Sequence, residues 1–144
     1  MRSRVIRLLL PLALLATVGV GAAMAASTSM RSSGGTVNAV NSAKYGMVLA
    51  SSSGTTLYRY TLDKKGVSMC SGACAKFWPP LLMKGNAKPT VGAGVSAGLL
   101  GTIKRSNGVA QVSYAGFPLY FYAGDRKPGD VVQCFTVEEI KRSL

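Results

Sequence analysis

The chain has 144 residues, with 17 Lys or Arg, five Asp or Glu and no histidine, so its formal net charge is +12. Without histidine, general acid–base chemistry has few candidates and a serine nucleophile lacks its usual base, which argues against an enzyme. The length suits one domain with a modest core and not two.

Residues 1–25 are predicted to be a secretory signal peptide, cleaved after Ala25. Three arginines precede an apolar run over residues 8–20, and an Ala-Met-Ala site at residues 23–25 follows; these are the three parts of such a peptide. The alternative is an uncleaved membrane anchor, because residues 8–26 are about long enough to span a bilayer.

Cleavage would lower the net charge from +12 to +9, because three arginines leave with the peptide. A small exported protein this basic should adhere to anionic surfaces. We expect an anionic envelope polymer or a lipid surface as its partner, with peripheral membrane association, in the periplasm or outside the cell. Export argues against nucleic acid. The alternative is that the lysines only keep the protein soluble.

Residues 26–43 are rich in Ser, Gly, Asn, Thr and Ala and have little to bury, which predicts a flexible leader. The folded domain is then expected over residues 44–144. It should open with a hairpin: a strand over 45–50, a turn over 51–54 and a second strand over 55–62.

Side chains should alternate along that second strand. Tyr58, Tyr60 and Leu62 share one face, which we expect to cover the core, and Arg59 lies on the outer face. The next elements are one or two helical turns near Cys70–Trp78, ended by Pro79 and Pro80, and a surface loop over residues 84–98.

A second hairpin follows, with strands over 99–105 and 109–114 around a Ser-Asn-Gly turn. The chain then turns into a strand over 117–122, where Pro118 indicates an edge or strand-start position. Residues 136–143 have capping-box spacing and are predicted to form a short C-terminal helix.

The two hairpins end in the same twelve-residue pattern, at residues 54–65 and 116–127. Six positions are identical, and a seventh exchanges lysine for arginine. We therefore predict a mainly β fold: one small antiparallel β domain built from two related hairpin repeats, at about 44–82 and 99–132. A single hairpin would not be stable alone in water, so the two should cover each other.

The three cysteines are expected to form one disulfide, between Cys70 and Cys74, and to leave Cys134 as a free thiol. Four residues apart on a helical turn, the first two are within disulfide reach. Pairing of Cys134 with either of them, or between two chains, stays open. No metal or other cofactor is expected, although two thiolates and Met69 would be suitable ligands for copper(I).

Asp63 and Asp125 are the acids of the repeated pattern. As a pair they could suggest glycoside hydrolysis, which uses two carboxyl groups at a set separation. Each follows a strand and precedes a basic turn, however, where Asp usually hydrogen-bonds the turn backbone. We assign both a structural role and expect no catalytic residue.

Aromatic side chains concentrate on the repeated pattern and beside the cysteines. Such residues are more often core than ligand platform. A fraction of them could line a groove for sugar rings or a quinone-like molecule, and the candidates for that groove are Tyr58, Tyr60, Trp78, Tyr120 and Tyr122.

Four motifs occur in order: Leu57-Tyr58-x-Tyr60-x-x-Asp63, Cys70-x-x-x-Cys74-Ala75-x-x-Trp78-Pro79-Pro80-Leu81, Leu100-Gly101-Thr102-Ile103-x-Arg105 and Gln111-Val112-x-Tyr114-x-Gly116-x-Pro118-Leu119-Tyr120. Together they resemble the bacterial secreted-repeat lipoproteins of unknown function. The resemblance implies export, a tandem repeat and an envelope location, and it supplies no activity. The chain lacks the lipid-bearing cysteine of many members, and a charged segment from Gln133 onward replaces their Gly-rich aromatic strand.

The sequence thus predicts an exported, non-enzymatic envelope module that binds an anionic component or serves a structural role. The alternative is a redox or electron-transfer accessory protein that uses Cys70 and Cys74, with or without a metal.

Overall fold

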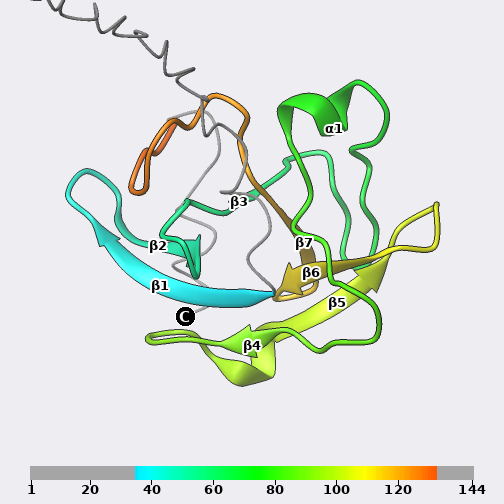
Figure 1. The fold of residues 1–144 in the computed structure, drawn as a ribbon, viewed down its shortest axis with the longest axis horizontal. Coiled ribbons are helices and arrows are strands. Elements are labelled where there is room, and N and C mark those ends of the chain that lie inside the picture. Colours follow the sequence, from blue (N-terminus) through cyan, green and yellow to red (C-terminus); the bar gives the residue numbers. More distant parts are fainter. Residues whose placement is uncertain (1–34, 133–144) are drawn as a thin grey trace, which may run out of the picture.

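The computed structural model describes residues 35–132 (Figure 1). The predicted signal peptide, Cys134 and the predicted C-terminal helix lie outside these residues. Within them, no helix has the length and apolar character needed to cross a bilayer.

The described chain is mainly β, as predicted, and forms two sheets. The three-stranded sheet has the order β2-β1-β4, and the four-stranded sheet has the order β3-β7-β6-β5. All pairings are antiparallel except that of β1 with β4. The strands are β1 (Thr36–Ser42), β2 (Gly46–Ser51), β3 (Tyr58–Arg59), β4 (Thr90–Val91), β5 (Leu100–Lys104), β6 (Ala110–Tyr114) and β7 (Phe117–Tyr120); the helices are α1 (Cys74–Phe77) and the 3-10 turn η1 (Ala97–Leu99).

Strand β1 corrects the prediction of a flexible leader over residues 26–43. It pairs with β2 along its length, from Val37 opposite Ser51 to Ser42 opposite Gly46. Ladder hydrogen bonds use only the backbone, so a strand of Ser, Asn and Thr residues can form when its partner is well placed. The folded part therefore includes residues 36–42, ahead of the predicted start at residue 44.

The predicted strand over residues 55–62 is also corrected. Only Tyr58–Arg59 forms a strand, and its partner is β7. Leu57 and Tyr58 are both buried, while Leu62 is 66% exposed, so the expected alternation of faces fails. The reason is that the chain leaves one sheet for the other here: the Leu57 N–H donates to Leu49 in β2, and Tyr58 pairs with Tyr120.

Pro118 is the second residue of β7, so the strand-start alternative of the prediction fits, although β7 is not an edge strand. Strand β7 sits between β3 and β6, but β3 pairs only with Leu119 and Tyr120. The ring nitrogen of Pro118, which cannot donate a hydrogen bond, therefore needs no β3 partner. The predicted loop over residues 84–98 is mostly irregular but contains β4, a two-residue strand that pairs with β1 in parallel.

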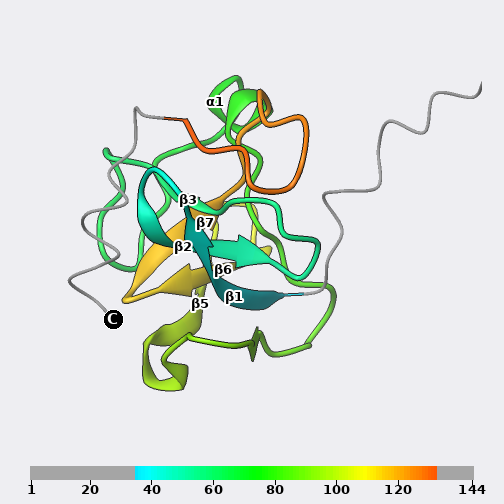
Figure 2. The same cartoon turned by 90° about the vertical axis from the view of Figure 1, so that its left-hand side faces the viewer.

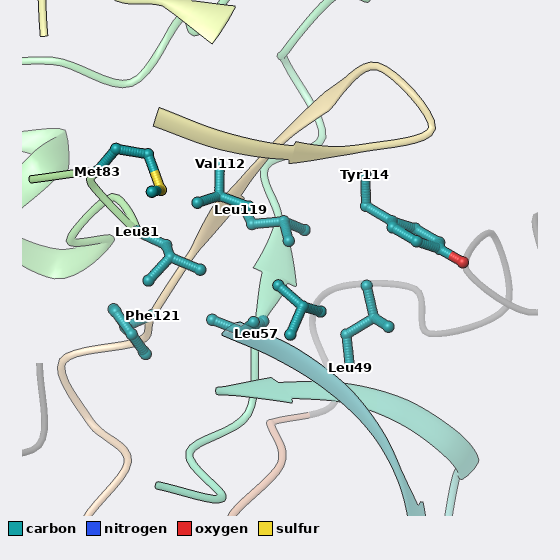
Figure 3. Packing of buried hydrophobic residues seen from close by; sticks show 9 residues of the cluster. Leu49, Leu57, Leu81, Met83, Val112, Tyr114, Leu119 and Phe121 are labelled. Carbon is teal, nitrogen blue, oxygen red and sulfur yellow. The ribbon is translucent and has the colours of Figure 1, made fainter. Parts of the chain in front are cut away.

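The core lies between the two sheets (Figures 2 and 3). Val37 and Leu49 come from the three-stranded sheet, and Val112, Tyr114 and Leu119 come from the four-stranded sheet. Connecting segments complete the cluster with Leu57, Leu81, Met83 and Phe121. Burial of these side chains is the main source of stability for so small a domain.

The two repeats are related by a local pseudo-twofold axis between β3 and β7. An isolated bridge between Ala50 and Thr56 joins β2 to the residues just before β3, so the two sheets meet at this point. Tyr58 and Tyr120, the same position of the repeated pattern, pair directly with each other. The predicted duplication is therefore also a structural one, and each unit has three strands, β1 to β3 and β5 to β7.

Backbone hydrogen bonds at the ends of the pattern obey the same symmetry. The Gly66 N–H donates to the Gly116 carbonyl at 2.8 Å, and the Gly129 N–H donates to the Gly54 carbonyl at 3.2 Å. Gly54 and Gly116 both have positive φ, at 79° and 83°, a conformation that side chains rarely adopt. In each repeat, the glycine that begins the pattern therefore accepts a hydrogen bond from the turn that follows the pattern in the other repeat.

Candidate functional site

The two tyrosine–aspartate pairs of the repeated pattern are exchanged between the repeats. The hydroxyl of Tyr58 donates to the carboxylate of Asp125 at 2.9 Å, so a tyrosine of the first copy binds the aspartate of the second. Tyr120 of the second copy interacts with Asp63 of the first. Burial raises the pKa of both phenols, that of Tyr120 to about 12, so both stay protonated at neutral pH and can donate.

Burial also raises the pKa of Asp125, to about 6, although the hydrogen bond from Tyr58 acts in the opposite direction. The negative charge of Asp130 adds a smaller increase. The loop that follows β7 packs against Tyr58 through its backbone. The Tyr58 hydroxyl accepts the Val132 N–H at 3.3 Å, and the Thr56 hydroxyl donates to the Asp130 carbonyl at 2.7 Å. The Tyr58–Asp125 pair therefore fixes the loop that follows β7.

Asp125 is expected to make the protein less stable as pH rises from about 4 to about 6. Its folded pKa lies above its ordinary value of 3.8, so the folded state binds the proton more tightly, and that stabilisation is lost as pH passes the folded pKa. Because the carboxyl is partly exposed, we expect a loss of only about 1 kcal/mol. The free energy of unfolding, measured by denaturant titration across this range, should show it.

The variant Asp125→Asn isolates this effect from those of the other two aspartates. The pKa of Asp63 is also raised and that of Asp130 is lowered, and both contributions remain in the variant. The free energy of unfolding of the native protein, minus that of the variant, should fall as pH rises from about 4 to about 6 and stay constant above that range. A difference that stays constant with pH would contradict the assignment.

Asp63 belongs to a more deeply buried polar network. Its Oδ1 accepts the Met69 N–H at 2.7 Å, and its side chain is 5% exposed. Burial raises the pKa of Asp63, while the Met69 N–H, the Tyr120 hydroxyl, Arg105 and Arg59 all favour its ionised form. The predicted structural role of Asp63 fits this local backbone contact.

Arg105 connects that network to the disulfide loop. It donates to the carbonyl of Cys70 at 2.6 Å, to the hydroxyl of Ser68 at 2.8 Å and to the side chain of Gln111. Ser68 in turn hydrogen-bonds the Tyr120 hydroxyl, and Gln111 donates to the Leu119 carbonyl at 2.8 Å. A single guanidinium therefore ties β5 and β6 of the second repeat to the disulfide loop of the first.

The structure contains the predicted disulfide between Cys70 and Cys74, with Cα atoms 5.3 Å apart. Cys70 is fully buried and Cys74 partly buried at the start of α1. After α1, the chain inserts between β6 and β7 where their direct pairing ends: Leu81 donates to the Leu119 carbonyl and accepts from the Val112 N–H. This insertion fixes Trp78 beside the repeated tyrosines.

The five aromatic residues of the predicted groove form two groups. Trp78 stacks on Tyr122, with ring centroids 4.6 Å apart, and Tyr58 meets both edge-on. Tyr60 and Tyr120 form a separate edge-on pair. Tyr58 and Tyr120 are almost fully buried and serve the interface between the repeats, so only Tyr60, Trp78 and Tyr122 have partly exposed rings that a ligand could reach.

The surface of residues 35–132 is strongly cationic, because exposed basic side chains outnumber the few acids and each acid takes part in a structural contact. The only three acids in this range are Asp63, which is buried, Asp125, which accepts from Tyr58, and Asp130, which accepts the N–H groups of Arg126 and Lys127. Nine basic residues in the same range are exposed: Lys44, Lys64, Lys65, Lys76, Lys84, Lys88, Lys104, Arg126 and Lys127.

The sequence reasoning found the aspartates, the tyrosines and the disulfide but missed the residues that connect them. Arg105, Gln111, Ser68 and Asp130 are isolated polar residues on strands or turns, and no spacing marks them. Arg105 and Gln111 do stand within motifs of the resemblance. Their contacts span up to 74 residues of sequence, as between Asp130 and Thr56, so only the tertiary structure shows them.

A family model described as a secreted repeat of unknown function matches residues 39–82 and 101–137, more than half of the chain. The first match begins within β1 and the second within β5, the first strands of the two structural units. No curated protein and no solved structure matches the chain.

Proposed function

The chain belongs to this family of secreted repeats of unknown function, and from that premise we propose that it is an exported, non-enzymatic envelope module that binds anionic envelope components through its basic surface. It acts in the periplasm or outside the cell. The observation that carries the proposal is the distribution of charge: nine exposed lysines and arginines face three described acids, each of which already accepts a hydrogen bond within the fold. Such a surface attracts polyanions, because few acidic side chains offset the positive potential of its basic residues.

Two basic pairs recur at the same position of the repeat. Lys64 and Lys65 follow Asp63, and Arg126 and Lys127 follow Asp125, and all four side chains are exposed. Each pair sits on a turn held by the hydrogen bonds between Gly66 and Gly116 or between Gly129 and Gly54. The fold therefore presents two copies of a pre-formed basic turn, and we assign them the main share of polyanion binding.

Retention on an immobilised polyanion such as dextran sulfate tests the proposal. Replacing all four residues of the two pairs with glutamine should lower the affinity about tenfold or more, since each basic residue near an anionic surface contributes up to roughly 1 kcal/mol. Retention of the native protein should fall steeply with added salt, because salt screens exposed charges.

A matched control replaces Lys44, Lys84, Lys88 and Lys104 with glutamine, which removes the same charge from other parts of the surface. This variant should keep most of the affinity. An equal loss in both variants would contradict the role of the basic turns, and retention that does not respond to salt would contradict the proposal as a whole.

The contacts of the disulfide support a structural role for it over the redox alternative. Cys70 is fully buried, and its carbonyl is bound by Arg105. Thiol exchange requires attack on an accessible sulfur, and in this arrangement only the partly buried Cys74 offers one.

A further inference from the structure

Exposed apolar side chains concentrate in one stretch, residues 62–77. Eight large apolar side chains of residues 35–132 are exposed, and the four most exposed all lie here: Leu62 at 66%, Phe77 at 64%, Met69 at 54% and Val67 at 47%. Single exposed apolar residues need no explanation, but four within sixteen residues do.

The same stretch carries three exposed lysines and no exposed acid. Lys64, Lys65 and Lys76 alternate along the chain with the apolar residues, and the only acid, Asp63, is 5% exposed. Apolar side chains that enter the boundary of a bilayer, flanked by lysines that meet its headgroups, are the combination by which peripheral proteins bind anionic lipid.

The stretch is also held in shape, so its apolar side chains do not fold back onto the core. The disulfide joins its two halves at Cys70 and Cys74, Arg105 binds the Cys70 carbonyl, and Asp63 binds the Met69 N–H. At its far end the Phe77 carbonyl accepts the Ala123 N–H. Figure 1 shows the stretch leaving β3 and ending in α1. A rigid presentation lowers the entropy lost on binding.

We propose that residues 62–77 dock this protein on an anionic phospholipid bilayer, with Leu62, Val67, Met69 and Phe77 entering the interface and Lys64, Lys65 and Lys76 meeting the headgroups. The proposal rests on the proposed function and makes it specific: it names the anionic component and the part of the surface that meets it. An acidic protein surface is the competing occupant, but it would not require exposed apolar side chains among the lysines.

Flotation of the mature chain, from residue 26 onward, with lipid vesicles tests the proposal. The protein should float with vesicles of mixed phosphatidylglycerol and phosphatidylcholine and stay behind with phosphatidylcholine alone. Leu62→Ser combined with Phe77→Ser should lower the partition coefficient about tenfold or more, because each substitution removes apolar area from the bilayer contact. The chain's single tryptophan, Trp78, directly follows Phe77. Brominated acyl chains should therefore quench its fluorescence in the native protein.

The control is Val91→Ser combined with Val109→Ser, which removes two exposed apolar side chains outside the stretch. It should float as the native protein does. Equal flotation of the Leu62 and Phe77 variant and the native protein would overturn the proposal, as would an equal loss in the control.

Dextran sulfate retention separates this proposal from the more general one. The Leu62 and Phe77 variant keeps every lysine and should be retained like the native protein. Retention on the polymer without flotation would overturn the membrane proposal and leave polyanion binding standing, whereas loss of both in the native protein would overturn both.

Discussion

Leu119→Ala and Leu57→Ala are each expected to lower the free energy of unfolding by about 3 kcal/mol, the usual size for truncating a buried leucine. The two leucines occupy the same position of the repeated pattern, are 2% and 1% exposed, and belong to the same core cluster (Figure 3). Because the pseudo-twofold axis lies between their strands, the two cavities should cost similar amounts. Denaturant titration of each variant measures both values.

Leu62→Ala is the matched control, since Leu62 lies in the same pattern but is 66% exposed. It should change the free energy of unfolding by no more than about 0.5 kcal/mol. If Leu57→Ala behaved like this control while Leu119→Ala did not, the symmetric packing of the two repeats would be wrong.

Arg105→Ala is expected to lower the free energy of unfolding by about 3 kcal/mol, because it removes the donor of three hydrogen bonds at once. The Cys70 carbonyl and the Gln111 side chain would be left inside the protein without this donor, and both residues are fully buried. The ionised form of Asp63 would also lose one of its stabilising charges. Denaturant titration gives the change.

Two further variants show whether the geometry of Arg105 matters. Arg105→Lys should recover only part of the loss, because one ammonium group cannot match a planar guanidinium that reaches three acceptors. Lys104→Ala, at the exposed neighbouring position, should be nearly neutral. Native stability in Arg105→Ala would contradict the clamp between β5, β6 and the disulfide loop.

The duplication was predictable because identical residues at a fixed spacing need no tertiary information. The hairpin β5–β6 was also predictable: Gly108 has φ of 82° in the Ser-Asn-Gly turn, as such a turn requires. The disulfide followed from the spacing of Cys70 and Cys74 together with the expected compartment. In each case the signal lies within a few neighbouring residues.

Strand β1 and the shortness of β3 could not be predicted in the same way. Residues 36–42 lack a run of apolar residues and are strand only because β2 offers them a complete ladder. Tyr58 and Leu57 are both buried, because other segments pack on both sides of the chain where it passes from one sheet to the other. The alternation of buried and exposed side chains is therefore lost.

For the candidate site, the sequence supplied the aromatic residues and aspartates but not their pairing. It gave no reason to expect that Tyr58 binds Asp125 of the other repeat, or that Tyr58 and Tyr120 lie inside the interface between the repeats. The exposure of the apolar residues at positions 62–77 could not be predicted either, because the spacing of Leu62 is that of a core position.

By itself, the amino-acid sequence determined that the chain is a tandem repeat of a tyrosine-rich β unit with an excess of positive charge, because repetition and composition are properties of residue order alone. The tertiary structure decided that the two units exchange their tyrosine–aspartate contacts across β3 and β7, and that Asp63 is buried while the lysines face solvent. The physical reason is that burial and hydrogen-bond partners depend on which segments meet in space, and here the partners lie more than 60 residues apart.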